Sequence, residues 1–295
     1  MNIKCGYPIA NPEYSDRLNM FEDILMNIIV QLIYFVGFVF IVGFIISLLN
    51  RLFYVIVKHN KAVCYATGFI GTPVHELSHA LLCLVFFHKI EKIKLFQIDD
   101  SNGVLGYVNH SYNKKNIYQL IGNYFIGVAP ILCGTVIIYF ATKFLLPDTY
   151  SEITKCLNEL APIQGTGLSE EWFVNMFVTL GGMIKAIFVG ITTGYKWWIY
   201  ILIIFCIALH MNLSGADIKN SLLGLPFVII VIAVINLIFG FFIKSAYTDF
   251  LGFMNSAGSY LTGTLLLSLI FSAITIIIGL LFRGVISLFA SVKNK

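Results

Sequence analysis

Two histidines and a glutamate stand within five residues of an apolar stretch of the chain. His75, Glu76 and His79 form the pattern His-Glu-x-x-His in GTPVHELSHALLCLV, residues 71–85. Residues four apart lie on one face of a helix, so both imidazoles can bind one Zn²⁺, with Glu76 beside them. Glu76 is then close enough to take a proton from a water that the metal activates. The pattern predicts a hydrolytic zinc site with Glu76 as its base.

His75, Glu76 and His79 could instead have a purely structural role. Polar side chains inside membrane helices can hold neighbouring helices together through hydrogen bonds. Ionisable groups at that depth are costly unless they are paired or coordinated, and they mark functional sites by default. We therefore favour the metal site.

A catalytic zinc site needs a third protein ligand and keeps one position for water. The soluble pattern HExxHxxGxxH would place glycine at 82 and histidine at 85, where this chain has Leu82 and Val85. That pattern is excluded. Three acidic residues that follow are second choices, because they fall in a segment expected to be a hairpin: Glu91, Asp99 and Asp100.

Better candidates for the third ligand lie in ALHMNLSGADIKN, residues 208–220. His210 and Asp217 are seven apart and would share a face of a continuous helix, so either could reach the metal. The carboxylate of Asp217 would also offset the charge of the cation. Asn212 or Ser214 could hydrogen-bond a developing oxyanion. A simpler alternative is that this polar group only marks where a helix meets the lipid headgroups.

The elements that position these residues are predicted to be membrane helices. Hydrophobic residues make up 58% of the 295-residue chain and charged residues 12%, whereas roughly 25% are charged in soluble domains. About 20 apolar residues cross the hydrocarbon core as a helix. Runs of this kind occupy residues 24–49, 62–87, 117–146, 196–213, 224–243 and 260–289. We expect an all-α polytopic protein of a cell membrane with six spanning helices, in a single domain covering residues 1–295.

The two parts of the site can meet only if they face the same side of the membrane. Helix 117–146 crosses back after helix 62–87, so helix 196–213 must be the next crossing. The apolar segment 172–192 should then lie on the surface or re-enter. Lysine and arginine are more frequent on one side of this arrangement, and the positive-inside rule places the hairpin and both termini in the cytoplasm.

Partners other than lipid and a membrane protein are not indicated. The net charge of +4 is spread along the chain without a basic block, which argues against nucleic acid. The six cysteines show no paired spacing, so we interpret those in apolar segments as small apolar side chains. These are Cys64, Cys83, Cys133 and Cys206, and three histidines at loops or helix boundaries receive no role: His59, His88 and His110.

With these residues, the chain resembles the site-2 protease family of intramembrane zinc metalloproteases. The resemblance rests on HELSH in an early membrane helix, a hairpin directly after it, and an aspartate near a later helix end, and it covers about residues 60–225. It implies that His75, His79 and Asp217 bind zinc and that Glu76 is the base. The substrate would be a transmembrane helix of a partner protein. The helices at 24–49, 224–243 and 260–289 would be additions to the family core.

The hairpin would then hold the substrate. It is predicted over residues 91–112, where Asn102-Gly103 supplies a strong turn signal. A protease that cuts a membrane helix must first unwind it, and the freed backbone groups need new partners. The exposed edge of a hairpin can supply them by strand addition.

Three other interpretations are compatible with the same residues. A catalytically silent relative of such proteases would act as a binding scaffold and would hold no zinc. A metal transporter or metal-binding membrane protein would use the histidines and Asp217 to bind an ion in transit. A zinc protease of the prenyl-protein type would take its third ligand elsewhere. Glu76 discriminates between hydrolysis and transport, because hydrolysis needs a carboxylate that is not a ligand.

Overall fold

The structure, a computed structural model, describes residues 12–98, 103–160 and 168–293. It is mostly helical, with one two-stranded sheet. A π-helical segment, Ile33–Gly37, joins the first two helices, and a 3-10 turn, Gly190–Thr193, precedes α7. The other elements are α1 (Pro12–Leu32), α2 (Phe38–Ile56), α3 (Lys61–Val85), β1 (Lys89–Lys94), β2 (Tyr107–Ser111), α4 (Ile117–Leu145), α5 (Pro147–Leu160), α6 (Glu170–Val189), α7 (Tyr195–His210), α8 (Gly215–Phe242) and α9 (Lys244–Lys293).

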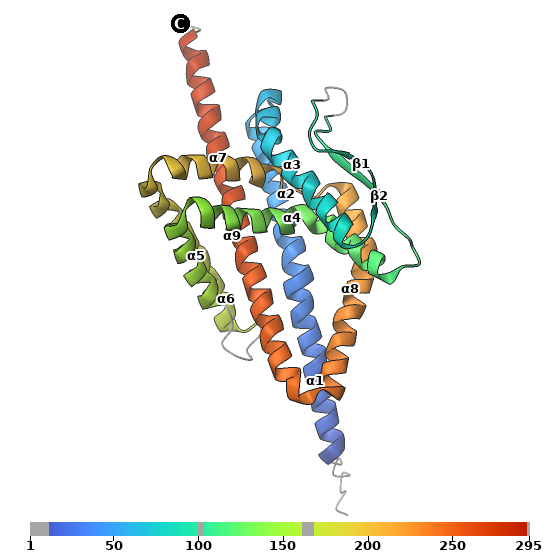
Figure 1. The fold of residues 1–295 in the computed structure, drawn as a ribbon. Helices are drawn as coiled ribbons and strands as arrows, with labels where there is room; N and C mark the ends of the chain where they lie inside the picture. Colours follow the sequence, from blue (N-terminus) through green and yellow to red (C-terminus); the bar gives the residue numbers. More distant parts are fainter. Residues whose placement is uncertain (1–11, 99–102, 161–167, 294–295) are drawn as a thin grey trace, which may run out of the picture.

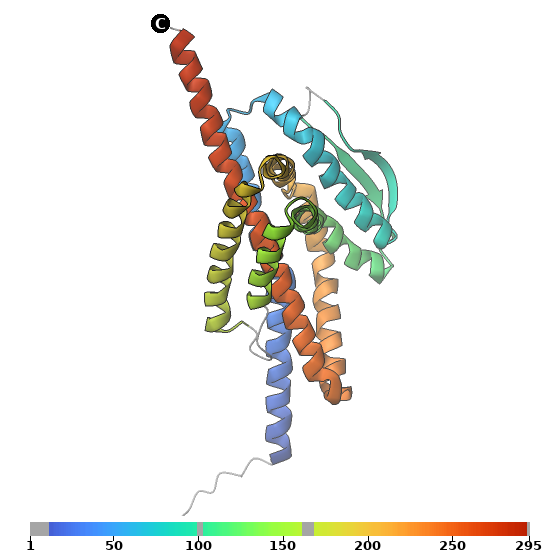
Figure 2. The same cartoon turned by 60° about the vertical axis from the view of Figure 1, so that its left-hand side comes forward.

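The long helices run in a common direction, and two helices lie across them. α1, α2, α8 and α9 follow the long axis of the molecule, whereas α4 and α7 cross it (Figure 1). In the view turned by 60°, α7 and much of α4 are seen almost end-on (Figure 2). α4 packs against α3, α7, α8 and α9. It is therefore the central element on which the site is assembled.

Five helical segments are long and apolar enough to cross a membrane: Met20–Ile56, Ile117–Leu145, Glu170–Thr193, Gly215–Phe242 and Ser245–Ser287. This composition is that of a membrane protein. Six spans were expected. α3 is not among the five because its histidines and glutamate lower its hydropathy, and α7 has only 16 residues. Glu170–Thr193, which contains the segment expected to lie on the surface or re-enter, is among them. The sides on which the termini lie stay a prediction.

The sheet follows the helix that carries the motif. β1 and β2 pair antiparallel, from Lys89 with Ser111 to Lys94 with Tyr107, with an irregularity in register between Ile90 and Lys92. Of the expected turn, Asn102 lies outside the described residues. Gly103 has φ of +68°, a conformation that favours glycine.

Candidate metal centre

α3 carries His75 and His79 one turn apart. Nδ1 of His75 lies 2.7 Å from the carbonyl oxygen of His210, and Nδ1 of His79 lies 2.8 Å from the carbonyl oxygen of Ile126. A carbonyl oxygen can only accept a hydrogen bond, so each neutral ring donates from Nδ1 and keeps a lone pair on Nε2. Histidines that bind metals are commonly oriented in this way, through a backbone carbonyl on the other ring nitrogen.

The two Nε2 atoms meet each other and one carboxylate oxygen. Nε2 of His75 lies 3.2 Å from Nε2 of His79, which lies 3.3 Å from Oδ1 of Asp217. Ligand nitrogens about 2.0–2.1 Å from a tetrahedral zinc are separated by about 3.3 Å. Two lone pairs facing one another at this distance repel unless a proton or a cation lies between them. These three predicted ligands thus form a group that could hold a metal ion.

Asp217 reaches the site from the start of α8. Residues 211–214 separate α7 from α8, so the expectation that His210 and Asp217 share a face of one continuous helix is wrong. Ser214 caps the new helix: its hydroxyl accepts from the Asp217 N–H at 3.2 Å, and its own N–H donates to Oδ2 of Asp217 at 2.7 Å. This capping box satisfies N–H groups that the helix start would leave unpaired. It also leaves Oδ1 facing His79.

Two glycines allow the surrounding helices to approach closely. A Cβ on Gly71 of α3 would overlap the carbonyl oxygen of Cys206 and the ring of His210 on α7. A Cβ on Gly127 of α4 would overlap the carbonyl oxygen of Asp217 on α8. Larger residues would therefore push apart the helices that carry the ligands and their hydrogen-bond partners.

Glu76 lies next to the ligands in the chain but is not part of the group. Its side chain is buried, with 7% of the residue exposed. Among the described residues, its carboxylate has no hydrogen bond or ion pair. Gly106, from the segment leading into β2, covers it, because a Cβ there would lie 2.8 Å from Cγ of Glu76. The carboxylate is therefore free to accept a proton, as a general base requires.

His210 and Asn212 do not join the group. Nδ1 of His210 lies 3.0 Å from the carbonyl oxygen of Cys206, and its buried Nε2 has no hydrogen-bond partner in the described structure. His210 contributes its backbone carbonyl instead. Asn212 is exposed and, together with His210, lines a cavity of about 480 Å³ between α2, the start of α3 and the hairpin. The oxyanion roles of Asn212 and Ser214 stay predictions.

Of the three acidic second choices, only Glu91 lies in the described part of the chain. Glu91 is exposed on β1, and it does not belong to either group of side chains that could hold a metal ion. Asp99 and Asp100 lie outside the described residues.

A second group of side chains that could hold a metal ion was not predicted. The ligand atoms of Cys83, His88 and His110 all lie within 4.8 Å of one another. Burial lowers the pKa of His88, and burial together with the neighbouring His88 lowers the pKa of His110 to about 4. The signal in the sequence is weak: Cys83 comes four residues after His79, on the same face of α3. His110 is brought to it only by the pairing of the strands.

Comparisons with protein-family models, with curated proteins and with solved structures give no match for this chain. Its function is therefore inferred from the site itself.

Proposed function

We propose that this chain is a zinc-dependent intramembrane endopeptidase that cleaves a transmembrane segment of a partner protein. The observation that carries this proposal is the convergence of Nε2 of His75, Nε2 of His79 and Oδ1 of Asp217, with both Nδ1 atoms already bonded to carbonyl oxygens. This donor set, two imidazoles and a carboxylate, is one that catalytic zinc sites use.

Each residue of the centre has a distinct role in this proposal. His75, His79 and Asp217 would hold the cation, and a catalytic zinc site keeps a further position for water. A bound zinc would polarise the scissile carbonyl and make water a stronger acid. Glu76 takes the proton from the attacking water and delivers it to the leaving amine. Ser214 holds Asp217 in place through the capping box.

The hairpin supports a membrane helix as the substrate. A helical peptide bond is shielded by its own hydrogen bonds, so the segment must be unwound before it is cut. Gly106 lies against Glu76, and β2 begins at the next residue. A substrate strand that paired with the hairpin would therefore pass close to the base. Five apolar helical segments would place the protein in the bilayer with such substrates.

A metal transporter would also use His75, His79 and Asp217. An ion in transit would be expected to bind the nearby carboxylate of Glu76 as a further ligand. Glu76 is not among the side chains that converge, and this favours a base over a ligand.

The test uses full-length protein in lipid vesicles, with its zinc content measured and cleavage followed on a library of single-span transmembrane peptides by mass spectrometry. We expect zinc-dependent cleavage within the apolar segment. The double variant His75→Ala with His79→Ala should lose about one zinc per chain and all cleavage. Full zinc retention by this double variant would refute the site, and cleavage that persists after chelation would refute the mechanism.

A further inference from the structure

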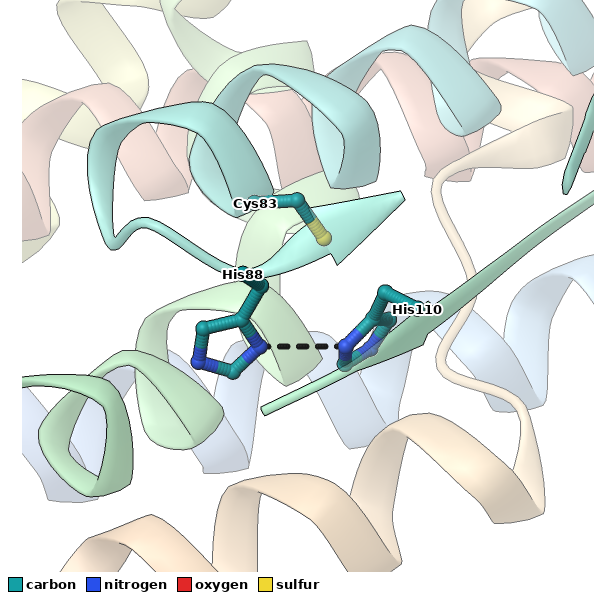
Figure 3. A group of neighbouring side chains, drawn as sticks. All are labelled: Cys83, His88 and His110. Carbon is teal, nitrogen blue, oxygen red and sulfur yellow. Dashed lines mark hydrogen bonds between the residues drawn. The ribbon is translucent and has the colours of Figure 1, made fainter. Parts of the chain in front are cut away.

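The end of α3, the residue before β1, and β2 bring a thiol and two imidazoles together. Cys83 lies in the last turns of α3, His88 precedes β1, and His110 belongs to β2, where it pairs with Ile90. In Figure 3 the side chain of Cys83 extends toward the rings of His88 and His110, and these two rings face each other across a short gap. We infer that Cys83, His88 and His110 form a second zinc site, separate from the centre that contains His75.

The tautomer of His88 is fixed by its surroundings. Its Nε2 lies 2.9 Å from the carbonyl oxygen of Gln119 near the start of α4. Because that oxygen only accepts, Nε2 carries the proton and Nδ1 keeps the lone pair. Nδ1 of His88 therefore faces the gap as a ligand atom, with its orientation set by a backbone carbonyl, as at His75 and His79.

His110 presents the matching atom. Its Nδ1 lies 3.0 Å from Nδ1 of His88 (Figure 3), close to the separation of about 3.3 Å between nitrogens bound to one tetrahedral zinc. Without a metal, a single N–H···N hydrogen bond would join the two rings. The stacking of His88 on Tyr112, with centroids 5.1 Å apart, would persist in either case.

A hydrogen bond between His88 and His110 would explain the position of the two rings, but it would not explain the thiol of Cys83 beside them. Cys83 is 0% exposed, and in the described part of the chain its sulfur has no hydrogen-bond partner. Thiolate and imidazole are both zinc ligands, and a water or a further ligand would fill the fourth position. Binding releases the thiol proton to solvent, so no redox step is needed.

A metal here would tie three elements together at the base of the hairpin. The candidate ligands come from the end of α3 and from one end of the sheet, where His88 precedes β1 and His110 lies in β2, and His88 also hydrogen-bonds to α4. The site would fix the hairpin over Glu76 without taking part in the chemistry. It shares no residue with the first group, so it does not depend on the proposed protease activity.

Cobalt substitution tests this inference, because a cobalt–thiolate bond gives a near-ultraviolet charge-transfer band that histidine and aspartate ligands do not. Detergent-solubilised full-length protein is stripped of metal and titrated with Co²⁺, and its zinc content is measured separately. We expect about two metals per chain and the thiolate band. Cys83→Ser should lose the band and about one metal per chain. Cys64→Ser, which alters a thiol at the other end of α3, should change neither.

His110→Gln provides a second variant that keeps a polar side chain and the strand, and it should also lose the band. The double variant at His75 and His79 should keep it. The inference would be overturned if the wild-type protein shows no thiolate band. It would also be overturned if the Cys83→Ser variant keeps both the band and the full metal content. Cleavage activity is not part of this readout, so failure of the second site and failure of the proposed function give different results.

Discussion

Nε2 of His75 lies 3.2 Å from Nε2 of His79. Both rings donate their proton from the opposite nitrogen to a backbone carbonyl, so no proton of either neutral ring lies between the two lone pairs. Turning either ring to relieve the repulsion would break a bond to His210 or Ile126. A cation between the nitrogens would remove the repulsion and keep both bonds, so this group of side chains could hold a metal ion.

Glu76→Gln should slow cleavage by orders of magnitude and leave the metal in place. The amide has the shape of the carboxylate but cannot accept the proton from water, and loss of a general base typically costs roughly 10²–10⁴ in rate. Metal content and peptide cleavage are measured on the same preparation. Glu91→Gln, on exposed β1, is the matched control. Normal cleavage by Glu76→Gln would exclude this base, and loss of metal would identify Glu76 as a ligand, as the transport interpretation requires.

Ser214→Ala should weaken metal binding more than it changes the fold. The variant removes the hydroxyl that caps α8, at a cost of about 1 kcal/mol in the free energy of unfolding. Loss of a group that orients a ligand lowers metal affinity by roughly 10–100-fold, which a competing chelator measures. Ser214→Thr keeps a hydroxyl and should restore affinity. A fall in turnover at unchanged affinity would instead assign Ser214 to the oxyanion.

Gly106→Ala should slow cleavage without loss of metal. The added Cβ would lie 2.8 Å from Cγ of Glu76 and 2.9 Å from the carbonyl oxygen of Lys94, so either the base or the hairpin must move. A displacement of about 1 Å near the reacting groups can cost roughly 10²-fold in rate. Gly215→Ala, at a position with nothing within 4 Å, is the control. Equal turnover numbers for the two variants would show that the hairpin does not position Glu76.

Proline on either side of Gly106 should interfere with substrate pairing. Leu105→Pro and Tyr107→Pro each remove one backbone donor, and Tyr107 is the first residue of β2, a position where strands tolerate proline. Loss of one hydrogen bond worth about 1 kcal/mol corresponds to roughly fivefold slower cleavage. Alanine at the same positions keeps the donor. We expect at least one proline variant to keep its metal and cleave more slowly than its alanine counterpart. If both proline variants match their alanine counterparts, the hairpin does not hold the substrate by strand addition.

The approach of the two histidines to one another could be predicted because their relation is local. His75 and His79 need only the helical repeat to meet. Asp217 was predicted as a candidate ligand, and its shared face with His210 required a continuous helix; the structure instead starts a new helix at Gly215, and Asp217 still lies beside both histidines. The pattern Ser214-x-x-Asp217 before an apolar run is itself a signal for a helix start, and it would have placed the carboxylate at the beginning of α8.

Other features depend on packing between distant segments. The group of Cys83, His88 and His110 forms only when the strands pair, and no periodicity within the chain indicates it. Similarly, α4 and α7 are as apolar as helices that follow the long axis, and hydropathy does not report that they lie across it (Figures 1 and 2). Hydropathy alone therefore does not determine how many of these helices span a membrane.

Asp217 uses its two carboxylate oxygens for different partners. Oδ2 closes the first turn of α8, and Oδ1 faces His79. Ordering of that turn and occupation of the site by a cation share one carboxylate, so each favours the other by the same free energy. A metal present at 100 times its dissociation constant stabilises a folded protein by about 2.7 kcal/mol. If a metal binds at this centre, part of that free energy would hold the first turn of α8 closed, so release of the metal and fraying of α8 would be coupled equilibria.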